Sequence, residues 1–104
     1  MIGLMAATVA SVFMTGTDLY SNCTGSTSAQ IDCLGYVSGV LDVTNDMETD
    51  GVIGAKFCTP EGIKRGQAMA VVVKYLRDNP SLRAASASKL VVMAMIKEFP
   101  CPKG

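Results

Sequence analysis

Apolar residues recur at helical spacing in several segments of this chain, and polar or glycine-containing stretches separate those segments. The first segment is short: a helix is predicted over about 17–23, with Thr15 or Thr17 as its N-terminal cap. The polar stretch TGSTS, at 24–28, predicts a turn. The next helix is predicted over about 29–45.

The helix predicted over 29–45 has one apolar half and one half that contains small residues. Glycine costs helix stability, so Gly35 and Gly39 indicate that another backbone approaches the helix closely there. We expect that backbone to belong to the core of the same chain, and the alternative is a second subunit. The apolar half consists of Ala29, Cys33, Tyr36, Val37, Val40, Leu41 and Val43, and the opposite side carries Gly35, Ser38, Gly39 and Asp42.

Residues 45–57 interrupt the helical pattern. Three carboxylates, Asp46, Glu48 and Asp50, alternate along this stretch, and two glycines follow them. This composition predicts a long loop with an acidic tip. The tip is a candidate partner-binding surface, because fixed negative charge suits a basic cleft in a protein partner. The alternative is a solvated loop whose charges keep the protein soluble.

Two further helices complete the pattern. Pro60 suits the first position of a helix, with Thr59 as its cap, and this helix is predicted to continue to about Asn79 as the buried centre of the domain. The last helix is predicted to begin within 81–89 and to run to Phe99, and its segment LVVMAMI is apolar on every side. The pattern as a whole therefore predicts an all-α fold.

Four widely spaced cysteines, without a C-x-x-C motif, indicate disulfides and an oxidising compartment rather than a zinc site. Four cysteines allow three pairings. A hairpin formed by the last two helices would bring Cys58 and Cys101 together, and Cys23 and Cys33 flank the polar turn, so we favour these two pairs. The domain is thus predicted to be a small bundle of about four helices held by disulfides.

The domain is predicted to span residues 17–104, and residues 1–16 are interpreted as a signal peptide or an apolar N-terminal segment. The first 14 residues carry no charge and are long enough for the hydrophobic part of a signal peptide, but short for a membrane span. Because no Lys or Arg precedes Lys56, the basic start of a signal peptide is missing, and a buried N-terminal helix is the alternative. Ala10, Ser11 and Met14 are the candidate positions for cleavage, and none of them completes an A-x-A site.

The charged residues exclude several classes of function. Nine basic and nine acidic side chains balance, and no basic cluster is longer than Lys64–Arg65, which argues against nucleic-acid binding. The absence of histidine excludes Ser-His and Cys-His nucleophile pairs. Asp42 and Asp46 lie one helical turn apart, but no metal motif or catalytic partner accompanies them. We therefore predict that the protein is not an enzyme and has no catalytic residue, metal or cofactor.

Five segments resemble the Rap/Tai family of small periplasmic immunity proteins, in the same order along the chain. They are CLGYVSGVLD (33–42), FCTPEGIKRGQ (57–67), VVVKYLRDNP (71–80), ASKLVVMAM (87–95) and FPCP (99–102). The resemblance implies an all-α, disulfide-bonded domain, often a homodimer, that binds a papain-like peptidoglycan amidase delivered by type VI secretion and blocks its active-site groove. The segment 45–57 departs from the family pattern, and we expect partner choice to reside there.

The first hypothesis is therefore a periplasmic immunity protein that inhibits a type VI secretion amidase effector. The second is a housekeeping periplasmic protein, with a binding or chaperone-like role, built on the same scaffold. The first predicts one tight protein partner, whereas the second predicts several weak partners and exposed apolar surface. Neither predicts a nucleic-acid partner or a stable membrane span.

Overall fold

A computed structural model describes residues 12–103. Within these residues the chain forms four α-helices and a short 3-10 helix, which confirms the all-α prediction. The elements are α1 (Gly16–Cys23), α2 (Thr27–Thr49), α3 (Arg65–Asp78), η2 (Pro80–Leu82) and α4 (Ala87–Glu98).

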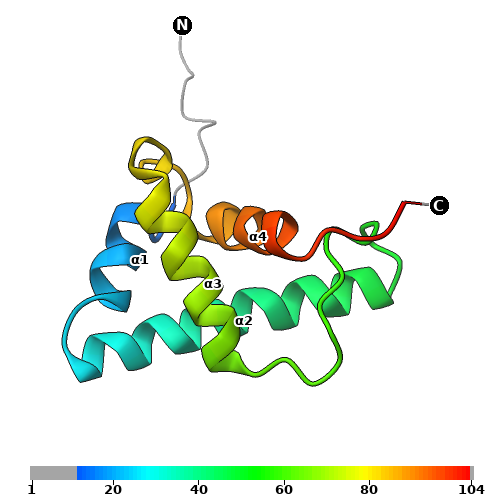
Figure 1. Ribbon diagram of the computed structural model, residues 1–104, viewed down its shortest axis with the longest axis horizontal. Coiled ribbons are helices and arrows are strands. Elements are labelled where there is room, and N and C mark those ends of the chain that lie inside the picture. Colours follow the sequence, from blue (N-terminus) through cyan, green and yellow to red (C-terminus); the bar gives the residue numbers. More distant parts are fainter. Residues whose placement is uncertain (1–11, 104) are drawn as a thin grey trace, which may run out of the picture.

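The longest helix, α2, runs along the length of the molecule, and α3 crosses it (Figure 1). Helix α1 packs at the N-terminal end of α2, and α4 lies beside the C-terminal half of α2. Each of the four α-helices contacts the other three, so all four contribute to one core.

The first two helices begin at polar caps. The side-chain oxygen of Thr15 accepts the backbone N–H of Asp18 at 3.2 Å, and the Asp18 carboxylate accepts the N–H of Thr15 at 3.1 Å, which forms a capping box. This confirms Thr15 as the cap of α1. Ser26 caps α2 in the same way, since its hydroxyl oxygen accepts the N–H of Ala29 at 3.2 Å.

Helix α2 continues beyond its predicted end. It runs to Thr49, because no residue before Gly51 breaks the helical backbone. Gly51 has a φ of 75°, in the left-handed region that commonly ends helices and favours glycine. The prediction of a loop over 45–57 is therefore wrong for its first residues, and 46–49 are helical.

Helix α3 begins later than predicted. Pro60 lies in a turn rather than at the first helical position, and Gly62, with a φ of 82°, prevents a continuous helix from there. The helix starts at Arg65. Its preceding residue, Lys64, donates its backbone N–H to the side-chain oxygen of Gln67 at 2.8 Å. This side-chain acceptor satisfies one donor at the start of the helix.

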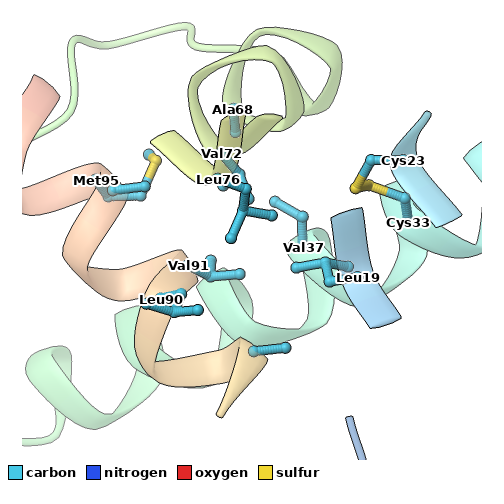
Figure 2. Close-up of a cluster of buried hydrophobic side chains, with 12 residues drawn as sticks. Leu19, Cys23, Cys33, Val37, Ala68, Val72, Leu76, Leu90, Val91 and Met95 are labelled. Carbon is cyan, nitrogen blue, oxygen red and sulfur yellow. A yellow bond between two sulfur atoms is a disulfide. The ribbon is translucent and has the colours of Figure 1, made fainter. Parts of the chain in front are cut away.

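The core lies where the four helices meet (Figure 2). Helix α4 contributes five of its residues and α3 contributes three at four-residue spacing, so α4 is buried over more of its surface than α3. The expectation that α3 is the buried centre is therefore only partly correct. The buried apolar residues are Leu19, Cys23, Cys33, Val37, Ala68, Val72, Leu76, Ala87, Leu90, Val91, Ala94 and Met95.

Met14 and Thr15, just before α1, pair with the chain at the start of α4. The predicted signal segment falls largely on residues 1–11, which lie outside the described residues. The carbonyl of Met14 accepts the N–H of Ala87 at 2.9 Å, and Thr15 forms an isolated antiparallel bridge with Ser86. A chain that started at residue 17 would lose these bonds and the cap of α1.

Two disulfides, Cys23–Cys33 and Cys58–Cys101, join the elements, in the pairing favoured from the sequence. The first is buried and links α1 to α2. The sequence predicts that the second disulfide joins the start of a helix to the end of the last one. Cys58 lies instead in the segment before α3, because that helix begins later than predicted. The Cys58 N–H also donates to the carbonyl of Phe99 at 2.8 Å, so this segment is fixed against the chain that follows α4.

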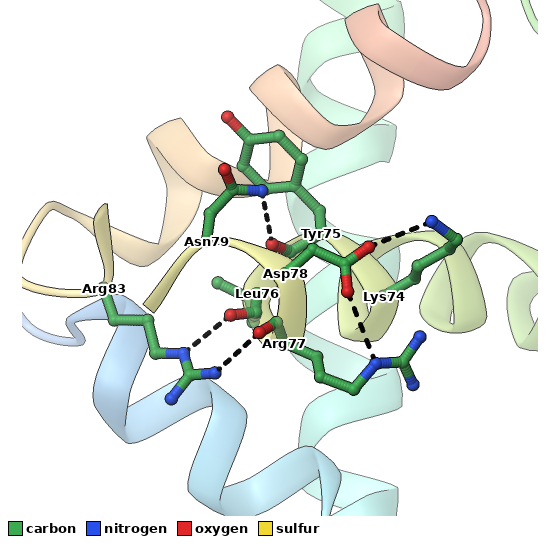
Figure 3. A network of polar contacts seen from close by, with 7 residues as sticks. All are labelled: Lys74, Tyr75, Leu76, Arg77, Asp78, Asn79 and Arg83. Atoms are coloured by element: carbon green, nitrogen blue, oxygen red, sulfur yellow. Dashed lines mark hydrogen bonds and ion pairs between the residues drawn. The ribbon is translucent and has the colours of Figure 1, made fainter. Parts of the chain in front are cut away.

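Arg83 connects the C-terminal end of α3 to α1 (Figure 3). Its guanidinium donates to the carbonyls of Leu76 at 2.7 Å and Arg77 at 3.2 Å, which satisfies two acceptors at the helix end. The guanidinium also lies 4.0 Å from the centre of the Tyr20 ring, a cation–π contact. In addition, the carbonyl of Arg83 accepts the N–H of Thr17 at 2.9 Å.

Candidate functional site

The predicted acidic residues lie at the C-terminal end of α2 rather than on a loop tip. Asp46 and Glu48 are in the last turns of the helix, and Asp50 is its C-terminal cap. Carboxylates at this position face the negative end of the helix dipole, so they do not stabilise the helix. The acidic end of α2, defined as Asp46, Glu48 and Asp50, therefore presents negative charge on a rigid element.

The three carboxylates do not all point to the same side of the helix. The Glu48 carboxylate accepts the backbone N–H of Lys56 at 3.0 Å, so it fixes the segment that follows α2. Asp46 and Asp50 are exposed and lie four residues apart, on one side of the helix end. Glu48 therefore has a structural role, whereas Asp46 and Asp50 present exposed negative charge.

A groove of about 810 Å³ lies between α2 and α4, and its lining is mostly apolar. Helix α2 forms one wall and α4 forms the other. The apolar segment LVVMAMI forms part of the α4 wall. Its residues Val92 and Met93 line the groove, whereas their neighbours Val91 and Ala94 are buried. Val43, on the α2 wall, is 58% exposed.

Gly35 and Gly39 lie on the α2 wall of this groove. Within residues 12–103, a Cβ atom built at either position would meet no atom within 4 Å outside its own helix. The expectation that these glycines allow close contact within the core is therefore wrong. They leave the surface of α2 flat and open, and the fold itself does not require them.

Sequence reasoning identified the two glycines but not the groove. The signals were present, since small residues on α2 and an α4 segment that is apolar all round both indicate surface that needs a partner. What the sequence did not reveal is that the outward faces of α2 and α4 lie side by side. That arrangement depends on the crossing of the helices.

The described residues contain neither a cluster of metal ligands nor a membrane-spanning helix. Within residues 12–103, no group of three or more His, Cys, Asp or Glu side chains is placed to hold a metal ion. Among the helices of that part of the chain, none is long and apolar enough to cross a membrane.

The fold and these surfaces define a class of protein: a small helical domain, joined by two disulfides, with an exposed apolar groove and a charged helix end. The chain belongs to the Rap1a immunity protein family, whose model matches residues 15–101. Searches of the curated proteins and of the solved structures found no significant match. An immunity protein implies a toxin as its partner.

Proposed function

We propose that this protein is a periplasmic immunity protein that binds a papain-like peptidoglycan amidase, delivered by type VI secretion, and covers the active-site groove of that enzyme. The observation that carries the proposal is the family match over residues 15–101. The protein acts by binding and not by catalysis. A rigid domain suits this role, because a preformed surface loses little entropy when it binds.

The periplasmic location is supported by the disulfides. Two disulfides indicate an oxidising compartment, and the bacterial periplasm is one. The uncharged N-terminal residues are proposed to direct export, with cleavage after Ala10, Ser11 or Met14. Each of these positions precedes Thr15, so the cap of α1 is retained.

The test of this function is inhibition. The oxidised protein is titrated into peptidoglycan digestion by a panel of type VI papain-like amidases. Stoichiometric inhibition of one enzyme at nanomolar concentration is expected. If no member of a broad panel is inhibited, the immunity proposal is wrong and the fold is unaffected.

The acidic end of α2 is proposed to contact the toxin. Reversal of charge in Asp46→Lys should slow association with the inhibited amidase by about tenfold at low salt, because exposed interface charges act mainly on the association rate. The matched control is Glu61→Lys, which reverses an exposed carboxylate in the turn before α3. Stopped-flow or surface plasmon measurements at two salt concentrations check this, and equal rates for wild type and Asp46→Lys would rule out the contact.

The protein is also proposed to form a homodimer, as the resemblance implies. Sedimentation equilibrium of the oxidised protein measures this directly. A single monomeric species at micromolar concentration would exclude a stable dimer.

A second candidate function is a housekeeping periplasmic binding or chaperone-like role. The exposed apolar groove favours it, because chaperone-like proteins use such surfaces to bind several partners weakly. Suppression of the aggregation of unrelated unfolded proteins, together with failure to inhibit any amidase, would support this candidate over the first.

A further inference from the structure

The groove between α2 and α4 is a surface feature that the fold leaves unexplained. It is open, mostly apolar and bounded by two helices along its length. Its α2 wall is flat because Gly35 and Gly39 carry no side chain and no other part of the described residues covers them within 4 Å. A third helix packs well against such a surface, since glycines allow its backbone to approach closely.

The charges beside the groove determine what kind of helix fits. Helix α2 contains four carboxylates and no Lys or Arg. Residues seven apart on a helix point in nearly the same direction, so Asp32 and Asp46 lie on the same side of α2 as Gly39, one before it and one after it. At 1.5 Å per residue, the two carboxylates are about 21 Å apart. Lys89 lines the α4 wall of the groove.

We propose that this groove binds an amphipathic helix of a partner protein, with apolar side chains that fill the groove and Lys or Arg residues near each end that contact Asp32 and Asp46. Such binding follows the helix-in-groove mode, in which side chains spaced by three or four residues anchor the helix. The spacing of the carboxylates corresponds to about four turns of the bound helix. The proposal rests on the proposed function only for the identity of the partner, which would then be the toxin.

Charge also disfavours a second copy of this chain that packs its α2 on this α2. If α2 packed on α2 of another copy in an antiparallel direction about Gly39, Asp32 would lie opposite Asp46 at both ends of the contact. A parallel arrangement would place Asp32 opposite Asp32 and Asp46 opposite Asp46. Both arrangements bring like charges together, which is unfavourable, whereas a helix with basic ends neutralises them.

The first test uses a designed peptide, so that it does not depend on finding the toxin. The probe is an amphipathic peptide of roughly 18 residues, long enough to form a helix on binding, with leucines on one face and lysines near both ends. Its matched control carries glutamates in place of the lysines. Binding to the isotope-labelled, oxidised protein is followed by NMR through the amide signals of Gly35 and Gly39.

The lysine peptide is expected to shift both glycine signals and to bind at least about tenfold more tightly than the glutamate peptide. Gly39→Leu places a bulky side chain in the groove and should weaken binding of the lysine peptide by at least about tenfold. The control is Gly66→Leu, which changes an exposed helical glycine on α3 that also has no neighbour within 4 Å. Circular dichroism verifies that both variants are folded.

Unmoved glycine signals, or equal binding by wild type and Gly39→Leu, would overturn the proposal. Sedimentation of the same samples tests whether a second copy of this chain occupies the groove. If the wild type is a dimer and Gly39→Leu is a monomer, a second copy fills the groove and the proposal is wrong.

The toxin itself provides the second test. For an amidase that the protein inhibits, Gly39→Leu should raise the concentration needed for inhibition by at least about tenfold, and unchanged inhibition would overturn the assignment of the groove to the toxin. If the peptide binds as expected but no amidase is inhibited, the proposed function fails while the groove remains a binding site for a basic amphipathic helix.

Discussion

At the residue scale, two glycines in helices have opposite surroundings. A Cβ atom at Gly16 would collide with the Leu90 side chain and lie 2.9 Å from the carbonyl oxygen of Arg83, whereas one at Gly35 would meet nothing. Gly16→Ala should therefore lower the free energy of unfolding by about 1–3 kcal/mol, because the backbone must shift. Gly35→Ala should raise it by about 0.5–1 kcal/mol, because alanine favours the helix. Urea unfolding followed by circular dichroism measures both, and equal effects would contradict this difference.

At the element scale, the last turn of α3 carries an exposed ion pair. The hydrogen bond from Lys74 to Asp78, 3.0 Å long, lowers the pKa of the Asp78 carboxyl below its ordinary value of 3.8, and the charges of Lys74 and Arg77 act in the same direction. Since the folded pKa is the lower one, this contribution to stability is present above the unfolded pKa and is lost as the pH falls through the folded pKa.

An NMR pH titration should therefore give Asp78 a pKa below 3.8 in the wild type, and Lys74→Met should raise that pKa towards 3.8. Added salt should reduce the difference, because the pair is exposed. The control is Lys97→Met, which removes a charge from α4. A pKa of Asp78 that is the same in wild type and Lys74→Met would show that the pair does not persist in solution.

At the scale of the whole molecule, the two disulfides differ in exposure. Cys23 and Cys33 are buried, whereas Cys58 is exposed and Cys101 is half-buried. Limited reduction with dithiothreitol should therefore release Cys58 and Cys101 first, as shown by mass spectrometry after alkylation. Their bridge spans 43 residues, so replacing both by alanine should cost about 4 kcal/mol on the loop-entropy estimate. Simultaneous release of all four thiols would indicate that reduction requires global unfolding.

Local signals predicted much of the fold, and they failed where backbone conformation depends on distant contacts. The cap at Thr15 could be predicted because it needs only a short polar side chain followed three residues later by Asp18. The start of α3 could not, because Pro60 carries a genuine helix-start signal that the left-handed backbone of Gly62 overrides. The prediction placed the acidic residues on a loop, whereas they lie at the end of α2, because a run of carboxylates near glycines has the same pattern in a loop and at a helix end.

The sequence by itself determined the helical class, the number of helices, the pairing of the cysteines and the resemblance to immunity proteins, because these depend on periodicity, cysteine spacing and motif order. Only the tertiary structure decided which apolar faces are covered. The core buries one face of α2 and five residues of α4, and outward residues of both helices line the same groove. Helix α3 crosses α2 (Figure 1). Burial is a property of the packed helices together, so the groove beside Gly39 became visible only when all four were in place.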